Sequence, residues 1–250
     1  MKTNMTNLLH GDCLELMKTI ENGSVDLILT DPPYGTTACK WDSVIPFEPM
    51  WEQLNRIIKP NGAIVLFGSE PFSSALRMSN IKKYKYDCYW EKSKPVNHIN
   101  AKHQPMRKIE TISIFYSKQP TFNRVKKEIP IITTSTTKNT VFGKSINNYT
   151  REVTHNANFD LLSFKGDTNK LHPTQKPVAL MEYLIKTYTN EGELVLDFTM
   201  GSFTTAIACL NTKRDFIGIE LDEKYFEVGT KRVNEHLKTL DYTPKICYNV

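Results

Sequence analysis

The chain has 250 residues, of which 40% are hydrophobic and 24% charged, and its formal net charge is +5. This length suits one α/β domain with an insertion and a substantial core, and the lack of any run of about 18 apolar residues excludes a membrane-spanning helix. The five cysteines are scattered without C-x-x-C spacing, and the first residues lack an apolar signal core. We therefore expect no disulfide framework, no metal site and a cytoplasmic location.

The first predicted strand, residues 7–12, ends in a turn at Gly11 and Asp12. Residues 13–20 then show helical spacing, and Asp12 stands where the N-cap of that helix belongs. An acid at the carboxyl end of a strand could equally accept a hydrogen bond from the amino group of an adenine. Both roles for Asp12 are open at this point.

The second predicted strand, residues 25–30, is a short apolar run typical of a buried parallel strand. It stops abruptly at residues 31–34 (DPPY), because two successive prolines offer no N–H to a sheet and Pro32 disfavours helical geometry at Asp31. An acid and the Tyr34 ring are therefore held on a stiff turn at the carboxyl end of a strand, the edge where open α/β sheets bind ligands.

This turn suits attack by an exocyclic amino group of a nucleobase. Such a nitrogen shares its lone pair with the ring and is a poor nucleophile. The Asp31 carboxylate and the Pro32 carbonyl can accept its two hydrogens and free the lone pair toward an electrophile, as rigid acceptors that need no reorganisation. The Tyr34 ring offers a face on which an extruded base can stack, worth roughly 1–3 kcal/mol.

The loop of residues 36–49 follows, and it carries Asp42; a loop of this length usually carries function or mobility. The hydrophobic pattern then predicts an amphipathic helix over residues 47–59, a buried strand over 63–68 and a helix over 70–80.

The pattern changes over residues 84–116, where two alternating stretches predict an antiparallel hairpin. Residues 82–151 contain 15 Lys and Arg but 4 Asp and Glu, whereas the remainder contains 17 and 23. A basic middle on an acidic remainder indicates a face that meets a polyanion. Residues 118–169 show weak periodicity and many polar side chains, and we interpret them as an inserted region.

The remaining predicted elements alternate, in the order helix 178–189, strand 194–197, helix 203–210, strand 216–220 and helix 223–240. Strand, glycine turn, helix, strand and terminal acid form a nucleotide-binding half of a Rossmann-type sheet. Glu220 lies 19 residues beyond Gly201, where an acid accepts hydrogen bonds from ribose hydroxyls. A nicotinamide enzyme would need G-x-G-x-x-G to bind a diphosphate, but this turn has a single glycine, so a cofactor without phosphates fits better. A P-loop is excluded because Lys138 stands where its first glycine belongs.

Residues 31–34 resemble the catalytic tetrapeptide of the S-adenosylmethionine-dependent DNA amino-methyltransferases. Residues 10–12, 172–177, 197–205 and 216–222 resemble further motifs of the same family. The order of catalytic turn, basic region and cofactor turn is similar to that of the beta group, whose members are circular permutations of the common fold. Permutation is physically reasonable, because domain termini often lie close together.

The resemblance implies a Rossmann-like α/β fold: a mostly parallel twisted sheet with helices on both faces and one antiparallel hairpin. It implies a single methyltransferase domain, residues 1–250, with a catalytic part at 1–117 and a cofactor part at 170–250. Residues 118–169 would be the inserted target-recognition region.

The resemblance also implies site residues. The catalytic residues would be Asp31, Pro32, Pro33 and Tyr34. The S-adenosylmethionine-binding residues would be Asp12, Asp31, Thr174, Lys176, Asp197, Phe198, Thr199, Gly201, Ser202, Glu220 and Leu221. Among these, Asp12 would hold the adenine, Glu220 the ribose, and the turn from Asp197 to Ser202 the methionine and sulfonium. One departure is Phe203, which replaces a glycine of the family turn where backbone and cofactor come close.

The resulting hypothesis is a site-specific DNA methyltransferase that flips a base out of the duplex and methylates its exocyclic amino group. Within the family, Asp at the first tetrapeptide position goes more often with adenine N6 and Ser with cytosine N4, so Asp31 predicts adenine. The alternatives are a cytosine N4 methyltransferase and a nucleic-acid-binding protein of the same fold that has lost transfer. Methylation of RNA or of a protein amide is a third. The expected partner is double-stranded DNA, with no membrane, and a homodimer and a cognate restriction enzyme are left open.

Overall fold

The structure is a computed structural model in which residues 4–36, 42–96, 98, 101–124, 158–167 and 175–249 are described. The chain divides into two compact units, one made of Met1–Asn123 and Asp160–Val250 and the other of Arg124–Phe159. The sheet, its helices and the candidate site all belong to the first unit. Most of the predicted insertion at residues 118–169 lies outside the described residues, and its boundaries stay a prediction.

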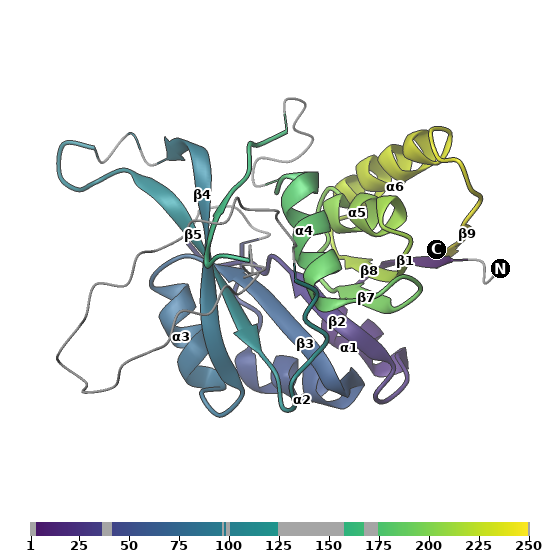
Figure 1. Ribbon diagram of the computed structural model, residues 1–250, viewed down its shortest axis with the longest axis horizontal. Coiled ribbons are helices and arrows are strands. Elements are labelled where there is room, and N and C mark those ends of the chain that lie inside the picture. The colour runs from purple at the N-terminus through teal and green to yellow at the C-terminus, as the bar shows by residue number, and fades with distance from the viewer. Residues whose placement is uncertain are drawn as a thin grey trace, which may run out of the picture. The chain divides into compact units, whose positions relative to one another are not determined.

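The described residues of the first unit form a nine-stranded sheet with the order β6-β4-β5-β3-β2-β7-β8-β1-β9 (Figure 1). Neighbouring strands run parallel except at β5, which is antiparallel to both β3 and β4. The strands are β1 (Met5–His10), β2 (Val25–Thr30), β3 (Ile58–Gly68), β4 (Tyr84–Val96), β5 (Arg107–Phe115), β6 (Leu161–Ser163), β7 (Leu194–Asp197), β8 (Asp215–Glu220) and β9 (Lys245–Asn249). This mostly parallel sheet with its β4–β5 hairpin is the predicted fold class.

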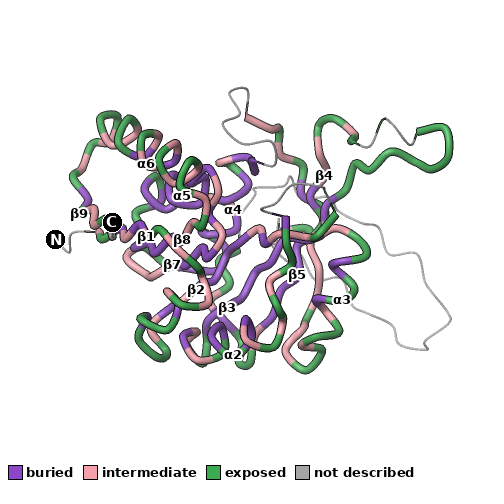
Figure 2. Tube along the Cα trace, turned by 180° about the vertical axis from the view of Figure 1, so that it is seen from behind, coloured by how far each residue is buried: buried purple, intermediate pink, exposed green. Residues whose placement is uncertain are grey.

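Helices cover both faces of the sheet (Figures 1 and 2). One face carries α1 (Cys13–Leu16), the 3₁₀ turn η1 (Met17–Thr19), α2 (Phe47–Ile57) and α3 (Phe72–Ser79), and the other carries α4 (Val178–Tyr188), α5 (Thr204–Asn211) and α6 (Glu223–Leu237). Side chains of a strand point alternately to opposite faces. In β2, Leu27 and Leu29 therefore join the core under α4 and α5, whereas Ile28 joins the core above α2. Val25 also joins the core above α2, because the register of β2 shifts between Val25 and Leu27.

The central position of β2 places the predicted catalytic turn next to the cofactor turn. Its neighbour β3 lies on one side and β7 on the other, and Ile28 of β2 stands opposite Leu196 of β7. Because both strands run in the same direction, their carboxyl ends lie side by side, with Asp31 after one and Asp197 at the end of the other. The strand β8 follows in the sheet and delivers Glu220 to the same edge.

Several elements differ from the sequence expectation, among them β6, which lies within residues 118–169 and was not predicted as a strand. The strand β3 begins at Ile58, five residues before the expected start, because Ile58 already pairs with Val25 ahead of a register shift. The strand β9 was not predicted, since its five residues carry little periodicity; it pairs with β1, which in turn pairs with β8. The two ends of the chain therefore meet in the sheet, as expected of a permuted fold. Within the described residues, no helix has the length and apolar character needed to cross a membrane.

Candidate active site

A cavity of about 1590 Å³ lies at the carboxyl ends of β1, β2, β7 and β8. It joins the turn after β2 to the glycine turn after β7. The predicted site residues that line it are Asp12, Asp31, Pro32, Pro33, Tyr34, Lys176, Asp197, Phe198, Thr199, Gly201, Ser202, Glu220 and Leu221. Thr174, the other residue predicted to contact the cofactor, lies outside the described residues.

The backbone of the catalytic turn is fixed by Asp42, from the loop that follows it. The Asp42 carboxylate accepts hydrogen bonds from the backbone N–H groups of Tyr34 (2.7 Å), Gly35 (2.9 Å) and Thr36 (2.9 Å). Gly35 has a φ of +67°, a left-handed conformation that favours glycine. Hydrogen bonds from N–H groups to an ionised carboxylate are among the stronger ones. Asp42 therefore clamps the turn, a role that its position in a loop did not reveal.

The Asp31 carboxylate belongs to a buried network of charges. It accepts a hydrogen bond from the Tyr34 hydroxyl and forms an ion pair with Lys176. The Lys176 ammonium also lies 2.8 Å from the Glu110 carboxylate, and Lys92 pairs with Glu110 at 2.6 Å. Two carboxylates therefore face two ammonium groups. Burial raises the pKa of Asp31, and the neighbouring Lys176 works against that increase.

Glu110 is a site residue that is not among those predicted from the sequence. It lies on β5 with only 4% of its surface exposed, in line with the buried residues Ile112 and Ile114 on the same face of the strand. Burial acts to raise its pKa, but Lys176 and Lys92 outweigh that effect and bring the pKa of Glu110 down to about 2. One feature of the sequence could have indicated Glu110 as a site residue: it is an acid on the inward-facing side of an apolar strand. A buried charge needs charged or hydrogen-bonding partners, so such a position indicates a cluster of polar groups.

The Tyr34 side chain is held by its hydroxyl. This group donates to Asp31 and lies within hydrogen-bond distance of Glu110 (2.9 Å), and the ring centroid is 5.1 Å from that of Phe72. Burial and the two carboxylates hold the pKa of Tyr34 well above its usual range, so the phenol stays protonated and acts as a donor. The stacking role of its ring stays a prediction.

On the cofactor side, the Asp197 carboxylate accepts from the hydroxyls of Thr30 and Thr205 and from the backbone N–H of Thr199 (3.1 Å). Asp197 is buried, and burial raises its pKa to about 6 in spite of these hydrogen bonds. The Thr199 hydroxyl also donates to the backbone carbonyl of Asp31 at 3.2 Å. The catalytic turn and the cofactor turn are therefore joined directly.

Glu220 and Asp12 are placed at the ends of neighbouring strands. Glu220 accepts from the backbone N–H of Gly201 (2.7 Å) and of Asp222 (2.9 Å), and burial raises its pKa. Gly201 adopts a φ of +53°, which favours glycine. Asp12 accepts from two N–H groups of α1, at 2.7 and 3.3 Å. Its role as the N-cap is confirmed, and the same residue lines the cavity.

Three further predicted residues complete the cofactor side of the cavity. Phe198 is buried in the core on the α2 side of the sheet. The Ser202 hydroxyl lies 3.3 Å from the side-chain oxygen of Gln175. Leu221 is 66% exposed at the margin of the cavity. Carboxylates dominate this side, which fits a cofactor that carries a positive sulfonium, ribose hydroxyls and no phosphate.

Phe203, which departs from the family turn, does not intrude on the cofactor side. Its φ is +63°, and its ring is fully buried against α6, 5.6 Å from the ring of Phe226. A Cβ added to Gly229 of α6 would lie 2.2 Å from the Phe203 ring. The missing side chain at Gly229 therefore provides the space for the phenylalanine.

We expect a Gly229→Ala variant to lower the free energy of unfolding by about 1–3 kcal/mol, because the added methyl would overlap the Phe203 ring. Thermal unfolding of the two proteins measures the difference. In a Phe203→Ala background the same change should be neutral or stabilising, since alanine is a better helix former than glycine. A G229A variant more stable than the parent chain would contradict this account of Phe203.

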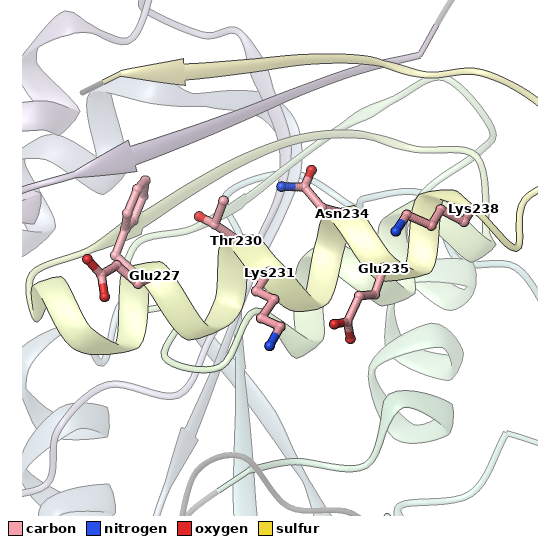
Figure 3. A pocket seen from close by; sticks show the side chains of 7 residues that line it. Glu227, Thr230, Lys231, Asn234, Glu235 and Lys238 are labelled. Atoms are coloured by element: carbon pink, nitrogen blue, oxygen red, sulfur yellow. The ribbon is translucent and has the colours of Figure 1, made fainter.

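A smaller hollow of about 500 Å³ lies along α6 (Figure 3). The side chains that line it are Phe226, Glu227, Thr230, Lys231, Asn234, Glu235 and Lys238. They carry charges of both signs, and none of them is a predicted site residue. This hollow is a feature of the helix surface and is separate from the residues gathered around Asp31.

The sheet is mostly parallel, and its central strands bring two turns to one cavity: the Asp31 turn with its prolines, and the glycine turn with its carboxylates. This arrangement defines a Rossmann-like methyltransferase. Comparison with known proteins then identifies the family. The DNA methylase family of N6 and N4 methyltransferases matches residues 25–231, and the chain belongs to it. The protein is a DNA methyltransferase that uses S-adenosylmethionine.

Relatives of this chain cover most of its length. The type II methyltransferase M.HpaI of Haemophilus parainfluenzae is 28% identical over 97% of this chain and 79% of its own. The DNA adenine methyltransferase YhdJ of Escherichia coli is 29% identical over 91% of this chain and 82% of its own. Among solved structures, the complex of M1.HpyAVI with S-adenosylmethionine is 28% identical with a TM-score of 0.64, covering 91% of this chain and all of the other. These comparisons confirm the predicted family, fold and cofactor.

Proposed function

We propose that this DNA methyltransferase acts on the N6 amino group of adenine at a specific site in double-stranded DNA. The observation that carries the proposal is the shared cavity, which is lined both by the Asp31–Tyr34 turn and by the turn at Gly201. An amino group bonded at the first turn would face a cofactor bound at the second. The aspartate at the first tetrapeptide position favours adenine over cytosine, and so does the resemblance to YhdJ, which is named a DNA adenine methyltransferase.

In this proposal the residues of the catalytic turn prepare the amino nitrogen. The Asp31 carboxylate and the Pro32 carbonyl accept its two hydrogens and direct its lone pair into the cavity. S-adenosylmethionine supplies an electrophilic methyl group when bound. Positive charge develops on the nitrogen during transfer, and the carboxylate of Asp31 stabilises it from a position fixed by Asp42 and Thr199. The ammonium of Lys176 favours the ionised form of Asp31, which is the stronger acceptor.

The cofactor would be held by the acids of the cavity. We assign the ribose to Glu220, the adenine to Asp12 and the methionine part to the turn of Asp197, Thr199, Gly201 and Ser202. Phe198, Leu221, Lys176 and Thr174 are proposed as further contacts. From the described residues, the Glu220 carboxylate accepts two hydrogen bonds and the Asp197 carboxylate three. A carboxylate has about four acceptor positions, so each can accept a further hydrogen bond from a ligand.

Double-stranded DNA would meet the basic middle of the chain, residues 82–151, which holds 15 Lys and Arg against 4 Asp and Glu. Flipping a base costs a few kcal/mol, and contacts between lysines and phosphates offset that cost. We further propose that residues 118–169 recognise the target sequence and that the protein acts in the cytoplasm. A homodimer and a cognate restriction enzyme stay open as further partners.

The experiment incubates the protein with duplex DNA and methyl-labelled S-adenosylmethionine, and then digests the DNA to nucleosides. We expect the label in N6-methyl-2′-deoxyadenosine. Label in N4-methyl-2′-deoxycytidine alone would replace the adenine assignment by its cytosine alternative. Label in a duplex RNA of the same sequence, with none in DNA, would overturn the DNA substrate.

A further inference from the structure

Each oxygen of the Asp31 carboxylate accepts a hydrogen bond from the chain itself before any base arrives. Its Oδ1 accepts the Tyr34 hydroxyl and its Oδ2 accepts the Lys176 ammonium. The proposed function needs the same carboxylate to accept a hydrogen from the target amino group. A carboxylate oxygen can take more than one hydrogen bond, but two donors already held by the chain compete for its lone pairs.

Glu110 is a second acceptor for both of these donors. Its Oε1 lies 2.9 Å from the Tyr34 hydroxyl and 2.8 Å from the Lys176 ammonium. A phenol has a single hydrogen, so Tyr34 can donate to Asp31 or to Glu110 but not to both at once. An ammonium has three hydrogens and can serve both carboxylates, with the shares set by their geometry. Asp31 and Glu110 therefore divide one pair of donors between them.

The position of Glu110 is fixed by the sheet. It stands opposite Trp90 in the β4–β5 pair, is buried, and has its other oxygen paired with Lys92 at 2.6 Å. Because Lys92 belongs to β4, both partners are held by strands, and the Glu110 carboxylate stays available as an acceptor whatever the catalytic turn binds.

We propose that Glu110 is a positioning residue that takes over the Tyr34 hydroxyl, and the larger share of Lys176, when the target amino group bonds to Asp31. The proposal rests on the proposed function of Asp31 as the acceptor for that amino group. No covalent bond forms or breaks at Glu110; two hydrogen bonds move from one carboxylate to another. The side chain acts through Tyr34 and Lys176 and does not contact the base.

The test compares Glu110→Gln with the parent protein under single-turnover conditions, using duplex DNA and labelled cofactor. In E110Q the donors have a weaker, uncharged alternative, so they stay on Asp31. We expect the rate of transfer to fall by about tenfold or more, while the Kd for S-adenosylmethionine, measured by calorimetry, changes by less than about twofold. Glu182→Gln is the matched control: Glu182 lies on α4, outside the proposed DNA-binding residues, and pairs with Lys186 at 3.6 Å on the surface. This substitution should leave the rate unchanged.

A double variant separates this role from a purely structural one. Tyr34→Phe keeps the ring but removes the hydroxyl, so there is no longer a hydrogen to relocate. In the Y34F background, E110Q should therefore cost much less than in the parent protein. If E110Q yields little folded protein, Glu110→Asp takes its place, because it keeps the charge on a shorter side chain. We expect E110D to lower the transfer rate less than E110Q, and to lower it less still in the Y34F background.

An E110Q rate equal to that of the parent protein would overturn the proposal, as would the same fold-loss in the presence and absence of the Tyr34 hydroxyl. A parent protein that labels neither base would instead refute the proposed function. The parent reaction therefore tells the two failures apart.

Discussion

An Asp31→Asn variant is expected to transfer methyl groups about a thousandfold more slowly than the parent protein, while binding S-adenosylmethionine within a few-fold as tightly. The amide has no charge to stabilise the developing positive nitrogen, and one of its two ends is a donor where an acceptor is needed. Removing one preorganised electrostatic partner of this kind costs about 10²–10³ in rate, and here the geometry for the amino group is lost as well.

The same variant should be at least as stable as the parent protein. Burial raises the pKa of Asp31, so the ionised side chain is unfavourable for folding at neutral pH, and a neutral amide removes that cost. Lys176 keeps its ion pair with Glu110 in the variant. Transfer is measured with labelled cofactor and stability by thermal unfolding.

Asp26→Asn provides the control from the other end of the same strand. Asp26 pairs with Lys59 at 2.7 Å and accepts the backbone N–H of Leu194 at 2.9 Å. Its loss should lower stability and leave the transfer rate near that of the parent protein. A D31N variant that keeps more than about a tenth of the parent rate would contradict the role of Asp31.

The parts of the site that follow one another in the sequence could be predicted, because their geometry is local. The apolar run of β2, the two prolines after it and the acid between them define a strand end and a stiff turn without any knowledge of the rest of the chain. The glycine turn after β7 and Glu220 are set in the same way, by one supersecondary unit of strand, helix and strand.

The residues that hold the site in place could not be predicted, because their partners are distant in the sequence. Tyr34 and Glu110 are 76 positions apart, and Asp31 and Lys176 are 145 apart. The alternating pattern predicts a hairpin over residues 84–116, but nothing in that pattern indicates which charged groups the buried carboxylate of Glu110 contacts. The sequence pattern places Asp42 in a loop, and only the fold shows that three N–H groups of the catalytic turn donate to its carboxylate.

Phe203 shows the same limit in another form. Judged from its own turn, a phenylalanine in place of glycine adds bulk beside the cofactor. The structure turns the ring toward α6, where Gly229 provides space. The left-handed φ of Phe203 destabilises the turn, because a residue with a large side chain rarely adopts it. Burial of the apolar ring offsets this loss of stability. Position 203 is therefore understood only together with position 229.

The buried charge network also predicts a large effect on stability. A Lys176→Met variant should lower the free energy of unfolding by about 3–5 kcal/mol, because it leaves the Asp31 and Glu110 carboxylates close together without the ammonium between them. Lys176 is 6% exposed, so water cannot take its place easily. Lys59→Met removes a lysine whose side chain is 37% exposed, and should cost about 1 kcal/mol or less.

The pH dependence of the K176M deficit identifies its origin. Without Lys176 the folded-state pKa of each carboxylate rises, and an acid whose pKa is raised by folding destabilises the protein most when it is ionised. The difference in free energy of unfolding between K176M and the parent protein should be largest at neutral pH. It should become smaller as the pH falls, because the carboxylates become protonated. Urea unfolding at several pH values measures this difference.

A second substitution, Glu110→Gln, removes one of the two carboxylate charges that repel each other in K176M. The double variant K176M/E110Q should therefore be more stable than K176M alone. The loss in free energy of unfolding caused by K176M could instead be the same at every pH and with either residue at position 110. Lys176 would then stabilise the fold through packing, for example through its contact with the Phe67 ring. The ion pairs with Asp31 and Glu110 would not stabilise the catalytic turn.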